Sequence, residues 1–417
     1  MPKVFAKNFV LSVLSRLACK RLSPQTEIIG ITGSVGKTTA KEAAAKILAQ
    51  RFAVKASEKS FNSEFGLPLT LLEEKSGYSS ALSWLGILLR SFLKSFTKLK
   101  ADELILEMGV DAPGDMQKLL KIVQPKIGAV LAIKPVHLAE GQFKSLEEIA
   151  TEKGQLIKSL SEEGTAILNA DDPLVAQMET SAKKITFGSR NPADLEAKSI
   201  LESLQGLSAE ISWKNQMAKL ALPILGKHNL TPILAAIAIG LTCGIELQDC
   251  LTALADFHLP PGRLSLLEGI NNSKIIDGSY NANPASSLAA LETLQSLETS
   301  GRKIVVLGQM NELGSDSTKL HLEIAKQLPE IADEIIGVFG DAIHFTKFAG
   351  DKNLPTHFFE TAEEAGDYLK PKLKANDLVL VKGSQNNVRL EKCVKKILAN
   401  PERDSSLLCR QGKEWGA

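Results

Sequence analysis

The segment best suited to chemistry is Thr32-Gly33-Ser34-Val35-Gly36-Lys37-Thr38-Thr39, which joins an apolar run to a helical pattern. Its glycines let the backbone curl round an anion, because no Cβ stands in the way. The first N–H groups of the following helix lie at the positive end of the helix dipole. We therefore expect Lys37 to reach nucleotide phosphates and Thr38 to ligate Mg²⁺. The general phosphate-loop pattern requires Gly where this chain has Ile31, so a plain glycine turn is the alternative.

Other charged and polar residues stand at places where a nucleotide site needs them. Glu107 closes a predicted strand, and a carboxylate at a strand's C-terminal end suits Mg²⁺. Arg263 follows Pro260-Pro261-Gly262, and its guanidinium fork suits phosphate oxygens. Asn229 stands where a helix begins and is a candidate N-cap. Lys153, taken alone, is expected to be an exposed lysine on a helix.

These residues need a scaffold in which strands and helices alternate. An apolar run at Glu27–Thr32 precedes the loop, and Ala40–Gln50 has a helical pattern. Further strands are predicted at Glu103–Glu107, Ile127–Ile133 and Thr165–Leu168, with helices between them. Such alternation favours a mostly parallel sheet that is covered on both faces.

Residues 184–225 differ, because short apolar runs are separated by turn residues. They predict a small antiparallel flap with strands at Ile185–Phe187, Ala209–Trp213 and Lys219–Leu225. Helices are predicted at 229–242 and 247–256, and the following proline-glycine cluster marks a domain boundary.

A second alternation begins at Arg263. Its predicted strands are Lys274–Asp277, Lys303–Leu307, Glu334–Phe339 and Leu378–Val381, with helices at 284–297, 318–328, 361–372 and 388–399. The predicted fold is therefore α/β: a central mononucleotide-binding domain with a phosphate loop, parallel sheet and small antiparallel flap, plus a C-terminal Rossmann-like α/β domain. We expect a basic amphipathic N-terminal segment (1–25), a central ATP-binding domain (26–258) and a C-terminal domain (259–417).

Composition narrows the classes of function. The net charge of +1 gives no global field that recruits nucleic acid. We expect neither a signal peptide nor a transmembrane helix, because no apolar run is long enough and no cleavage site follows the N-terminal apolar residues. The five cysteines contain no Cys-x-x-Cys pair and are expected to be reduced, buried thiols of a cytoplasmic protein.

The loop Thr32–Thr39 resembles the nucleotide loop of the Mur ligases, ATP-dependent enzymes that form the amide bonds of peptidoglycan precursors, and it shares their displaced first glycine. Two segments resemble the branch of this family that adds D-alanyl-D-alanine: Asn62-Ser63-Glu64-Phe65-Gly66-Leu67-Pro68 and Asp277-Gly278-Ser279-Tyr280-Asn281-Ala282-Asn283-Pro284. The resemblance continues in the family's motif order to about residue 399, at Glu107–Gly109, Val136–Leu138, Thr151–Lys153, Gly226–Asn229, Gly262–Arg263, Gly308–Gly314, Val381–Ser384 and Arg389–Glu391.

This resemblance implies that ATP and two Mg²⁺ ions are bound. The implied metal ligands are Thr38, Glu107, His137 and Lys153, the last of them carbamylated. The implied ATP contacts are Thr32–Thr39, Asn229, Arg263, Asp277, Tyr280 and Asn281. The implied catalytic residues are Lys37, Glu107, His137, Lys153 and Arg263. The implied substrate contacts are Asn62, Ser63, Lys382 and Arg389.

The implied reaction joins D-alanyl-D-alanine to a UDP-N-acetylmuramoyl-tripeptide through an acyl phosphate, in a cleft between two domains. Only about twenty-five residues precede the first strand, so we expect the family's usual N-terminal UDP-binding domain to be missing. Two alternatives remain open. One is a related amide ligase that acts on another acid, such as a folate or polyglutamate; the other is a non-catalytic ATP-binding partner.

The expected partners are small molecules and not nucleic acid, and we expect a monomer. Residues 3–21 and 81–98 combine apolar and basic side chains at helical spacing. This pattern suits a peripheral contact with a membrane or packing on the domain, and packing is the preferred interpretation.

Overall fold

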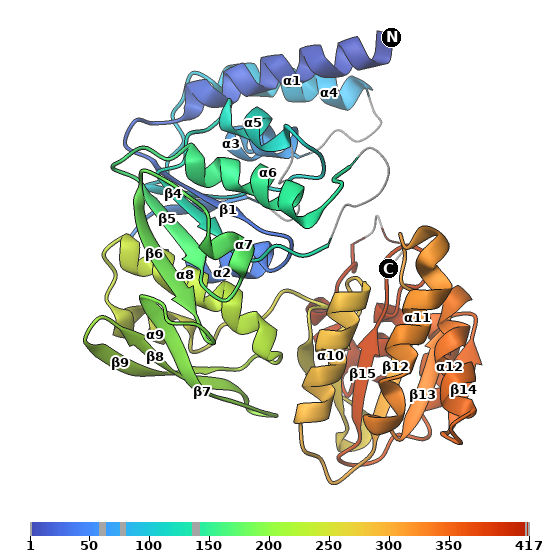
Figure 1. Ribbon diagram of the computed structural model, residues 1–417. Helices are drawn as coiled ribbons and strands as arrows, with labels where there is room; N and C mark the ends of the chain where they lie inside the picture. Colours follow the sequence, from blue (N-terminus) through green and yellow to red (C-terminus); the bar gives the residue numbers. More distant parts are fainter. Residues whose placement is uncertain (1, 58–63, 76–80, 136–141, 413–414, 416–417) are drawn as a thin grey trace. The chain divides into compact units, whose positions relative to one another are not determined.

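The computed structural model describes residues 2–57, 64–75, 81–135, 142–412 and 415, which form two compact units (Figure 1). Unit 1 comprises Met1–Ser199, Ala209–Leu220 and Asn229–Ala255. Unit 2 comprises Ile200–Ser208, Ala221–His228 and Asp256–Ala417. The predicted α/β class with parallel sheets is confirmed.

The first sheet has nine strands in the order β2-β3-β1-β4-β5-β6-β7-β8-β9. β1 (Glu27–Thr32) lies between β3 (Glu103–Glu107) and β4 (Ile127–Val130) and pairs in parallel with both. Because these strands run the same way, their C-terminal ends share one edge of the sheet. The other strands are β2 (Val54–Ala56), β5 (Thr165–Asn169), β6 (Lys183–Gly188), β7 (Leu195–Ser203), β8 (Gly206–Trp213) and β9 (Gln216–Leu222).

The antiparallel flap predicted for residues 184–225 is wrong at its first strand. β6 pairs in parallel with β5 and with β7. The connection from β5 to β6 contains a short helix, α7 (Pro173–Ala176), and such a crossover returns the chain in the same direction. Only β7, β8 and β9 are joined by two-residue turns, at 204–205 and 214–215, which reverse the chain.

Helices cover both faces of the parallel strands, as buried parallel sheets require. On one side α2 packs against α8 and α9, and α8 also contacts β5 and β6. On the other side α1 contacts α3 and α4, while α6 contacts α5 and β4. The bounds are α1 (Pro2–Arg21), α2 (Lys37–Leu48), α3 (Gly66–Leu72), α4 (Ala81–Lys94), α5 (Asp115–Leu120), α6 (Leu146–Lys158), α8 (Leu230–Thr242) and α9 (Leu247–Leu254).

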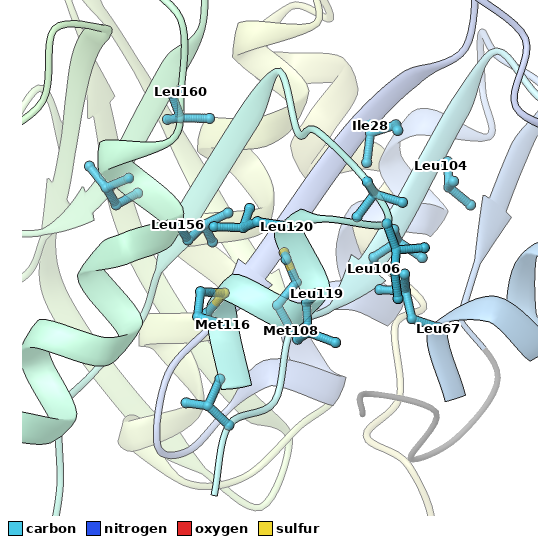
Figure 2. Packing of buried hydrophobic residues seen from close by; sticks show 14 of the residues in the cluster. Ile28, Leu67, Leu104, Leu106, Met108, Met116, Leu119, Leu120, Leu156 and Leu160 are labelled. Atoms are coloured by element: carbon cyan, nitrogen blue, oxygen red, sulfur yellow. The ribbon is translucent and has the colours of Figure 1, made fainter. Parts of the chain in front are cut away.

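Aliphatic side chains fill the space between the sheet and the second group of helices. Ile28 comes from β1, Leu104 and Leu106 from β3, Leu67 from α3 and Leu156 from α6 (Figure 2). All five are less than 9% exposed, so this cluster is a continuous core that fixes the strand ends near the loop.

Unit 2 contains a six-stranded sheet in the order β10-β11-β15-β12-β13-β14. β10 is antiparallel to β11, and the remaining neighbours pair in parallel. The strands are β10 (Ser265–Glu268), β11 (Lys274–Gly278), β12 (Lys303–Gly308), β13 (Glu334–Val338), β14 (Thr356–Phe359) and β15 (Leu378–Lys382). The helices are α10 (Pro284–Ser296), α11 (Ser317–Ala325), α12 (Ile343–Gly350), α13 (Ala362–Leu369), α14 (Glu391–Ile397) and α15 (Pro401–Asp404).

Alternate residues of β12 belong to two separate hydrophobic cores. Val305 and Leu307 belong to the cluster on one face of the sheet, and Ile304 and Val306 to the cluster on the other. This alternation is the reason that the central strands of unit 2 are apolar throughout. The two edge strands β10 and β14 were not predicted, because they are short and only partly buried.

The cysteines are all free thiols. Cys250, Cys393 and Cys409 are buried as expected, but Cys19 is exposed and Cys243 is partly exposed, so the expectation of burial is wrong for these two. Among the described helices, none has the length and apolar character needed to cross a bilayer.

Gly240 of α8 lies against α2 and α9. A Cβ there would stand 2.6 Å from Ile47 Cγ2 and 2.8 Å from Cys250 Sγ. Gly240→Ala is therefore expected to lower the free energy of unfolding by roughly 1–3 kcal/mol, although alanine favours a helix over glycine by about 1 kcal/mol.

The matched control is Gly86→Ala in α4, where a Cβ would meet only the flexible end of Arg90, at 3.2 Å. This variant is expected to be neutral or slightly stabilised. Urea unfolding followed by circular dichroism compares the two, and an unchanged midpoint for Gly240→Ala would contradict the close packing of α8.

Candidate active site

The loop after β1 has two glycines in backbone conformations that other residues avoid. Gly33 has a φ of 148° and Gly36 a φ of 84°. A Cβ on Gly33 would lie 3.0 Å from Leu131 Cβ, beside the end of β4. Glycine therefore allows the loop to stay against the sheet and to lead directly into α2.

The loop is anchored to the strands on both sides of β1. The Ser34 N–H donates to Ala132 O at 2.8 Å, and Ser34 Oγ accepts from the Lys134 N–H at 2.9 Å. On the other side, the Thr32 hydroxyl donates to Met108 O at 2.7 Å. The Thr32 side chain is thus part of the scaffold, whereas Ser34–Thr38 form the accessible part of the loop.

The accessible part of the loop ends at the first turn of α2. The helix begins at Lys37, earlier than predicted, and Gly36 caps it without a side chain. Lys37 Nζ folds back onto Gly33 O at 2.7 Å. A helix N-terminus without a side-chain cap, next to a lysine, can bind a phosphate group.

Glu107, the last residue of β3, meets a lysine that the sequence analysis did not single out. Lys41 of α2 is fully buried, and its Nζ lies 3.2 Å from Glu107 Oε1 and 2.5 Å from Ser57 O, to which it donates. Glu107 Oε1 itself makes no hydrogen bond. One signal was available, because Lys41 stands four residues after Lys37 and so lies on the same face of α2.

Lys153 of α6 is 1% exposed, so the expectation of an exposed lysine is wrong. The reason is its position on the apolar face of α6, in one stripe with Ile149, Leu156 and Ile157. Burial, helped by the positive charge of Lys37, lowers the pKa of Lys153 to about 7. Electrostatic interaction therefore links the loop lysine to α6.

Two buried polar residues that the sequence analysis missed hold the end of β4. Asn169 Nδ2 donates to Leu131 O at 2.6 Å, and Asp172 Oδ2 accepts from the Ile133 N–H at 2.8 Å. Asp172 also caps α7. The Asp-Pro pair at the start of a helix was the available signal.

Three predicted site residues lie outside the described residues: His137, Asn62 and Ser63.

Asn229 occupies the N-cap position of α8, as expected, but its side chain makes no capping hydrogen bond. A short 3₁₀-helix, Lys227–Asn229, leads into α8, and Asn229 itself has helical backbone angles. The start of α8 nevertheless borders the loop, because a Cβ on Gly36 would lie 3.4 Å from Pro232.

Unit 2 brings together a second group of predicted residues. The guanidinium carbon of Arg263 lies 4.6 Å from the centre of the Tyr280 ring, a cation–π contact. Gly262 has a φ of 73°, and its carbonyl accepts from the Tyr280 N–H at 3.1 Å. A Cβ on Gly262 would stand 2.8 Å from Tyr280 N, so glycine is required for this approach.

Asp277, near the end of β11, is fully buried, and this burial raises its pKa. Its Oδ1 accepts from the Ser279 N–H at 3.0 Å, while Oδ2 makes no hydrogen bond. A buried carboxylate oxygen without a partner is costly, so it is a candidate for binding a ligand hydroxyl.

Lys382 ends β15 beside Gly278. Its Nζ donates to Asn281 O and, at 3.4 Å, to Gly278 O. Burial and the charge of Arg263 lower the pKa of Lys382 to about 8, against the opposing effect of Asp277. A Cβ on Gly278 would lie 2.9 Å from Lys382 Cδ, which explains why glycine stands there.

An arginine close to the C-terminus, also missed, holds the segment around Tyr280. Arg410 donates to Ser279 O at 2.7 Å and to Tyr280 O at 2.8 Å. Fully buried Glu391 accepts from Arg410 Nη2 at 2.6 Å and from Arg389 Nε at 3.0 Å. Arg389 is therefore engaged within unit 2, beside the group of Arg263 and Tyr280.

No cluster of three or more His, Cys, Asp or Glu side chains that could hold a metal ion occurs within residues 2–57, 64–75, 81–135, 142–412 and 415. Glu107 is a buried carboxylate at the end of β3, beside β1; its Oε1 accepts no hydrogen bond, although Lys41 Nζ lies 3.2 Å away, and a carboxylate oxygen suits a cation.

Two family models match the chain. The Mur ligase middle domain matches residues 85–240, and the Mur ligase glutamate ligase domain matches residues 262–385.

Curated relatives and solved structures agree with these matches. The UDP-N-acetylmuramoyl-tripeptide--D-alanyl-D-alanine ligase of Bacillus subtilis is 30% identical, over 94% of this chain and 80% of that protein. The enzyme of the same name from Mycobacterium tuberculosis is 31% identical, over 90% of this chain and 74% of that protein. The crystal structure of MurF ligase from Thermotoga maritima in complex with ADP superposes with a TM-score of 0.76 at 25% identity. The superposition covers 95% of this chain and 84% of the Thermotoga maritima chain.

Breaking the buried ion pair of Lys41 and Glu107 is expected to lower the free energy of unfolding. Lys41→Met leaves a buried carboxylate without its cation, so the free energy of unfolding is expected to fall by roughly 3–5 kcal/mol. Adding Glu107→Gln to this variant is expected to restore most of the loss.

Lys46→Met, on the same helix and partly exposed, is the control and should change stability little. Denaturant unfolding of the wild type, the control, Lys41→Met, Glu107→Gln and the double variant measures the coupling. A Lys41→Met variant as stable as wild type would show that the pair does not hold α2 to β3.

Proposed function

Because the chain belongs to the Mur ligase family, we propose that it joins D-alanyl-D-alanine to a UDP-N-acetylmuramoyl-tripeptide in an ATP-dependent reaction that releases ADP and phosphate. The observation that carries this proposal is the 30% identity with the Bacillus subtilis ligase of that name along 94% of the chain. The chain is thus an ADP-forming amide ligase of peptidoglycan precursor synthesis.

The reaction forms two bonds in sequence. A carboxylate oxygen of the tripeptide attacks the γ-phosphorus of ATP, whose bond to the bridging oxygen breaks, and an acyl phosphate and ADP result. The amine of D-alanyl-D-alanine then attacks the acyl carbon and loses a proton, and the tetrahedral intermediate expels phosphate. Groups that stabilise negative charge on the phosphoryl oxygens are the main contribution of the protein.

For unit 1 we assign the phosphate contacts to Ser34–Thr38 and the N-terminus of α2. Lys37 would leave Gly33 O to reach the γ-phosphate, a small movement because its stem already lies along the loop. Asn229 would contact the nucleotide, which is supported by the position of α8 beside Gly36.

Mg²⁺ fits the same edge of the sheet. The Oε1 of Glu107, which accepts no hydrogen bond but lies 3.2 Å from Lys41 Nζ, and the Thr38 hydroxyl would hold it, together with His137 and a carbamylated Lys153. Lys153 fits this role because only a neutral amine adds to CO₂, and a pKa of about 7 makes that form abundant at neutral pH. The bound ions would neutralise charge on the β- and γ-phosphates.

For unit 2 we assign the ribose and adenine contacts to Asp277, Tyr280 and Asn281, and a phosphate contact to Arg263. The unpaired Oδ2 of Asp277 supports a hydroxyl contact. Substrate contacts by Asn62, Ser63, Lys382 and Arg389 stay predictions. In unit 2, Lys382 already donates a hydrogen bond to the carbonyl of Asn281, and Arg389 donates one to the carboxylate of Glu391.

We also propose that the protein is cytoplasmic, which its five free cysteines support, and that it is a monomer. A membrane contact is a separate proposal, which rests on an exposed face of α4.

ADP release tests the function. Purified protein is supplied with ATP, Mg²⁺, the UDP-linked tripeptide and D-alanyl-D-alanine, and we expect release only when both acceptor and dipeptide are present. Lys37→Ala is expected to lower the rate at least about 100-fold, because a cation at the transferred phosphoryl group is lost. Lys46→Ala, on the outer part of the same helix, should keep the rate.

The open alternatives predict other results. Turnover with a folate or polyglutamate pair, and none with the muramoyl pair, would replace the substrate assignment. ATP binding with no ADP release from any pair would instead favour a non-catalytic partner.

Carbamylation of Lys153 has its own measurement. With ¹³C-bicarbonate, a carbamate signal is expected to grow as the pH rises through about 7, because the lowered pKa makes the amine neutral above that value. Lys153→Arg keeps a cation but cannot form the carbamate, so its spectrum should lack the signal. A signal of equal size in both proteins would refute the carbamylation of Lys153, and it would not bear on the proposed ligase activity.

A further inference from the structure

Helix α4 is apolar both on the face that it buries and on a neighbouring face that it exposes. Its inner face packs Trp84, Ile87 and Leu88 against the core of unit 1. Its outer face presents four large apolar side chains that are between 51% and 65% exposed, and the next turn adds Phe96 at 73%. The outer residues are Leu85, Leu89, Phe92, Leu93 and Phe96.

The outer residues form one stripe and not a scatter. Leu85, Leu89, Phe92 and Phe96 are four, three and four residues apart, and Leu93 comes four residues after Leu89, so all five lie on the same side of α4. The rings of Phe92 and Phe96 contact each other edge to face, with centroids 5.1 Å apart. A contiguous exposed apolar stripe of this kind marks a surface that another apolar phase covers.

Positive charge surrounds this stripe. α1 lies beside α4 (Figure 1). The segments 1–26 and 75–101 hold ten Lys and Arg residues and no Asp or Glu, although the whole chain has a net charge of only +1. The ten residues are Lys3, Lys7, Arg16, Lys20, Arg21, Lys75, Arg90, Lys94, Lys98 and Lys100.

Two carboxylates at the end of α3 hold some of these cations at the border of the stripe. Glu74 accepts from Arg90 Nη2 and from Lys94 Nζ, both at 2.8 Å, and Glu73 accepts from Arg21 at 2.9 Å. Arg90 keeps 56% of its side chain exposed in this pair. Arg16, Lys20 and Lys100 are exposed and form no ion pair with a described carboxylate, so their charge faces outward.

We propose that the outer face of α4, with the exposed cations of α1 and of residues 98–100, docks on the surface of an anionic lipid bilayer. The helix would lie in the plane of the interface, with its leucines and phenylalanines among the acyl chains and the cations at the lipid phosphates. The ligase reaction does not require this contact, and its failure would leave the proposed function untouched.

The charge pattern favours this occupant over a second copy of the chain. In a symmetric dimer the same patch lies on both sides of the interface, so two bands of like charge would meet. An anionic membrane instead offers an apolar phase and negative charge together, which matches both features of the patch.

Vesicle co-sedimentation tests the proposal with the full chain. Vesicles of phosphatidylglycerol and phosphatidylcholine in equal parts are compared with phosphatidylcholine alone, at low salt and at about 0.5 M NaCl, where charges are screened beyond a few Å. We expect binding to the anionic vesicles that weakens at high salt. Leu85→Glu combined with Phe92→Glu is expected to lower the partition coefficient at least 10-fold.

A matched control carries the same charges on exposed apolar residues elsewhere. Leu201 and Met217 are 69% and 73% exposed on β7 and β9, and Leu201→Glu with Met217→Glu should bind vesicles as wild type does. A second variant, Arg16→Gln with Lys20→Gln, should lose binding to anionic vesicles while its stability stays unchanged. ADP release and thermal unfolding of all variants show that the fold is kept.

Three results would overturn the proposal. Wild type could fail to bind anionic vesicles at low salt, or bind both vesicle types equally, or the control pair could lose binding as much as the α4 pair. Sedimentation velocity adds a further outcome. Self-association that is abolished by Leu85→Glu with Phe92→Glu, without any vesicle binding, would assign the face to a second copy.

Discussion

A positive charge inside a protein needs a partner or must give up its proton, and the described part of unit 1, which carries the glycine loop, buries two lysine amines. The two amines satisfy this constraint differently. Lys41 forms an ion pair with Glu107, whereas burial and the charge of Lys37 lower the pKa of Lys153 to about 7. The start of α2, the end of β3 and the inner face of α6 therefore have to be arranged round these amines. The apolar core behind the strands keeps that arrangement, because it holds the strand ends in register.

The same constraint shapes unit 2. Lys382 is buried beside Asp277, and it is stabilised by backbone carbonyls at Gly278 and Asn281. The segment that carries Tyr280 is thus folded round an ammonium group on one side and held by Arg410 on the other. In unit 2 the segment of Tyr280 and Asn281 is thus bonded directly to a buried cation, whereas in unit 1 buried Lys41 joins α2 to Ser57 O and to Glu107.

Local signals in the sequence were sufficient to predict many of the strands and helices that carry the candidate site. The order of strand, glycine loop and helix around Thr32–Thr39 was predicted from the sequence, and so was the position of Glu107 at the end of a strand. Long-range contacts could not be predicted in the same way. The burial of Lys153 depends on which face of α6 meets the sheet, and Lys41 meets Glu107 across 66 residues of chain. The direction of β6 depended on a short helix in the crossover, which turn residues do not reveal.

Arg410 also sets an order of assembly during synthesis of the chain. Its contacts with Ser279 and Tyr280 join residues that are about 130 positions apart. Domains generally fold as units while the ribosome is still at work. Unit 1 ends its sequence at Ala255, so it can acquire its loop and core early. The Tyr280 segment, in contrast, is not held by Arg410 until that residue has left the ribosome, so in a nascent chain the loop after β1 can form well before the Tyr280 segment is complete.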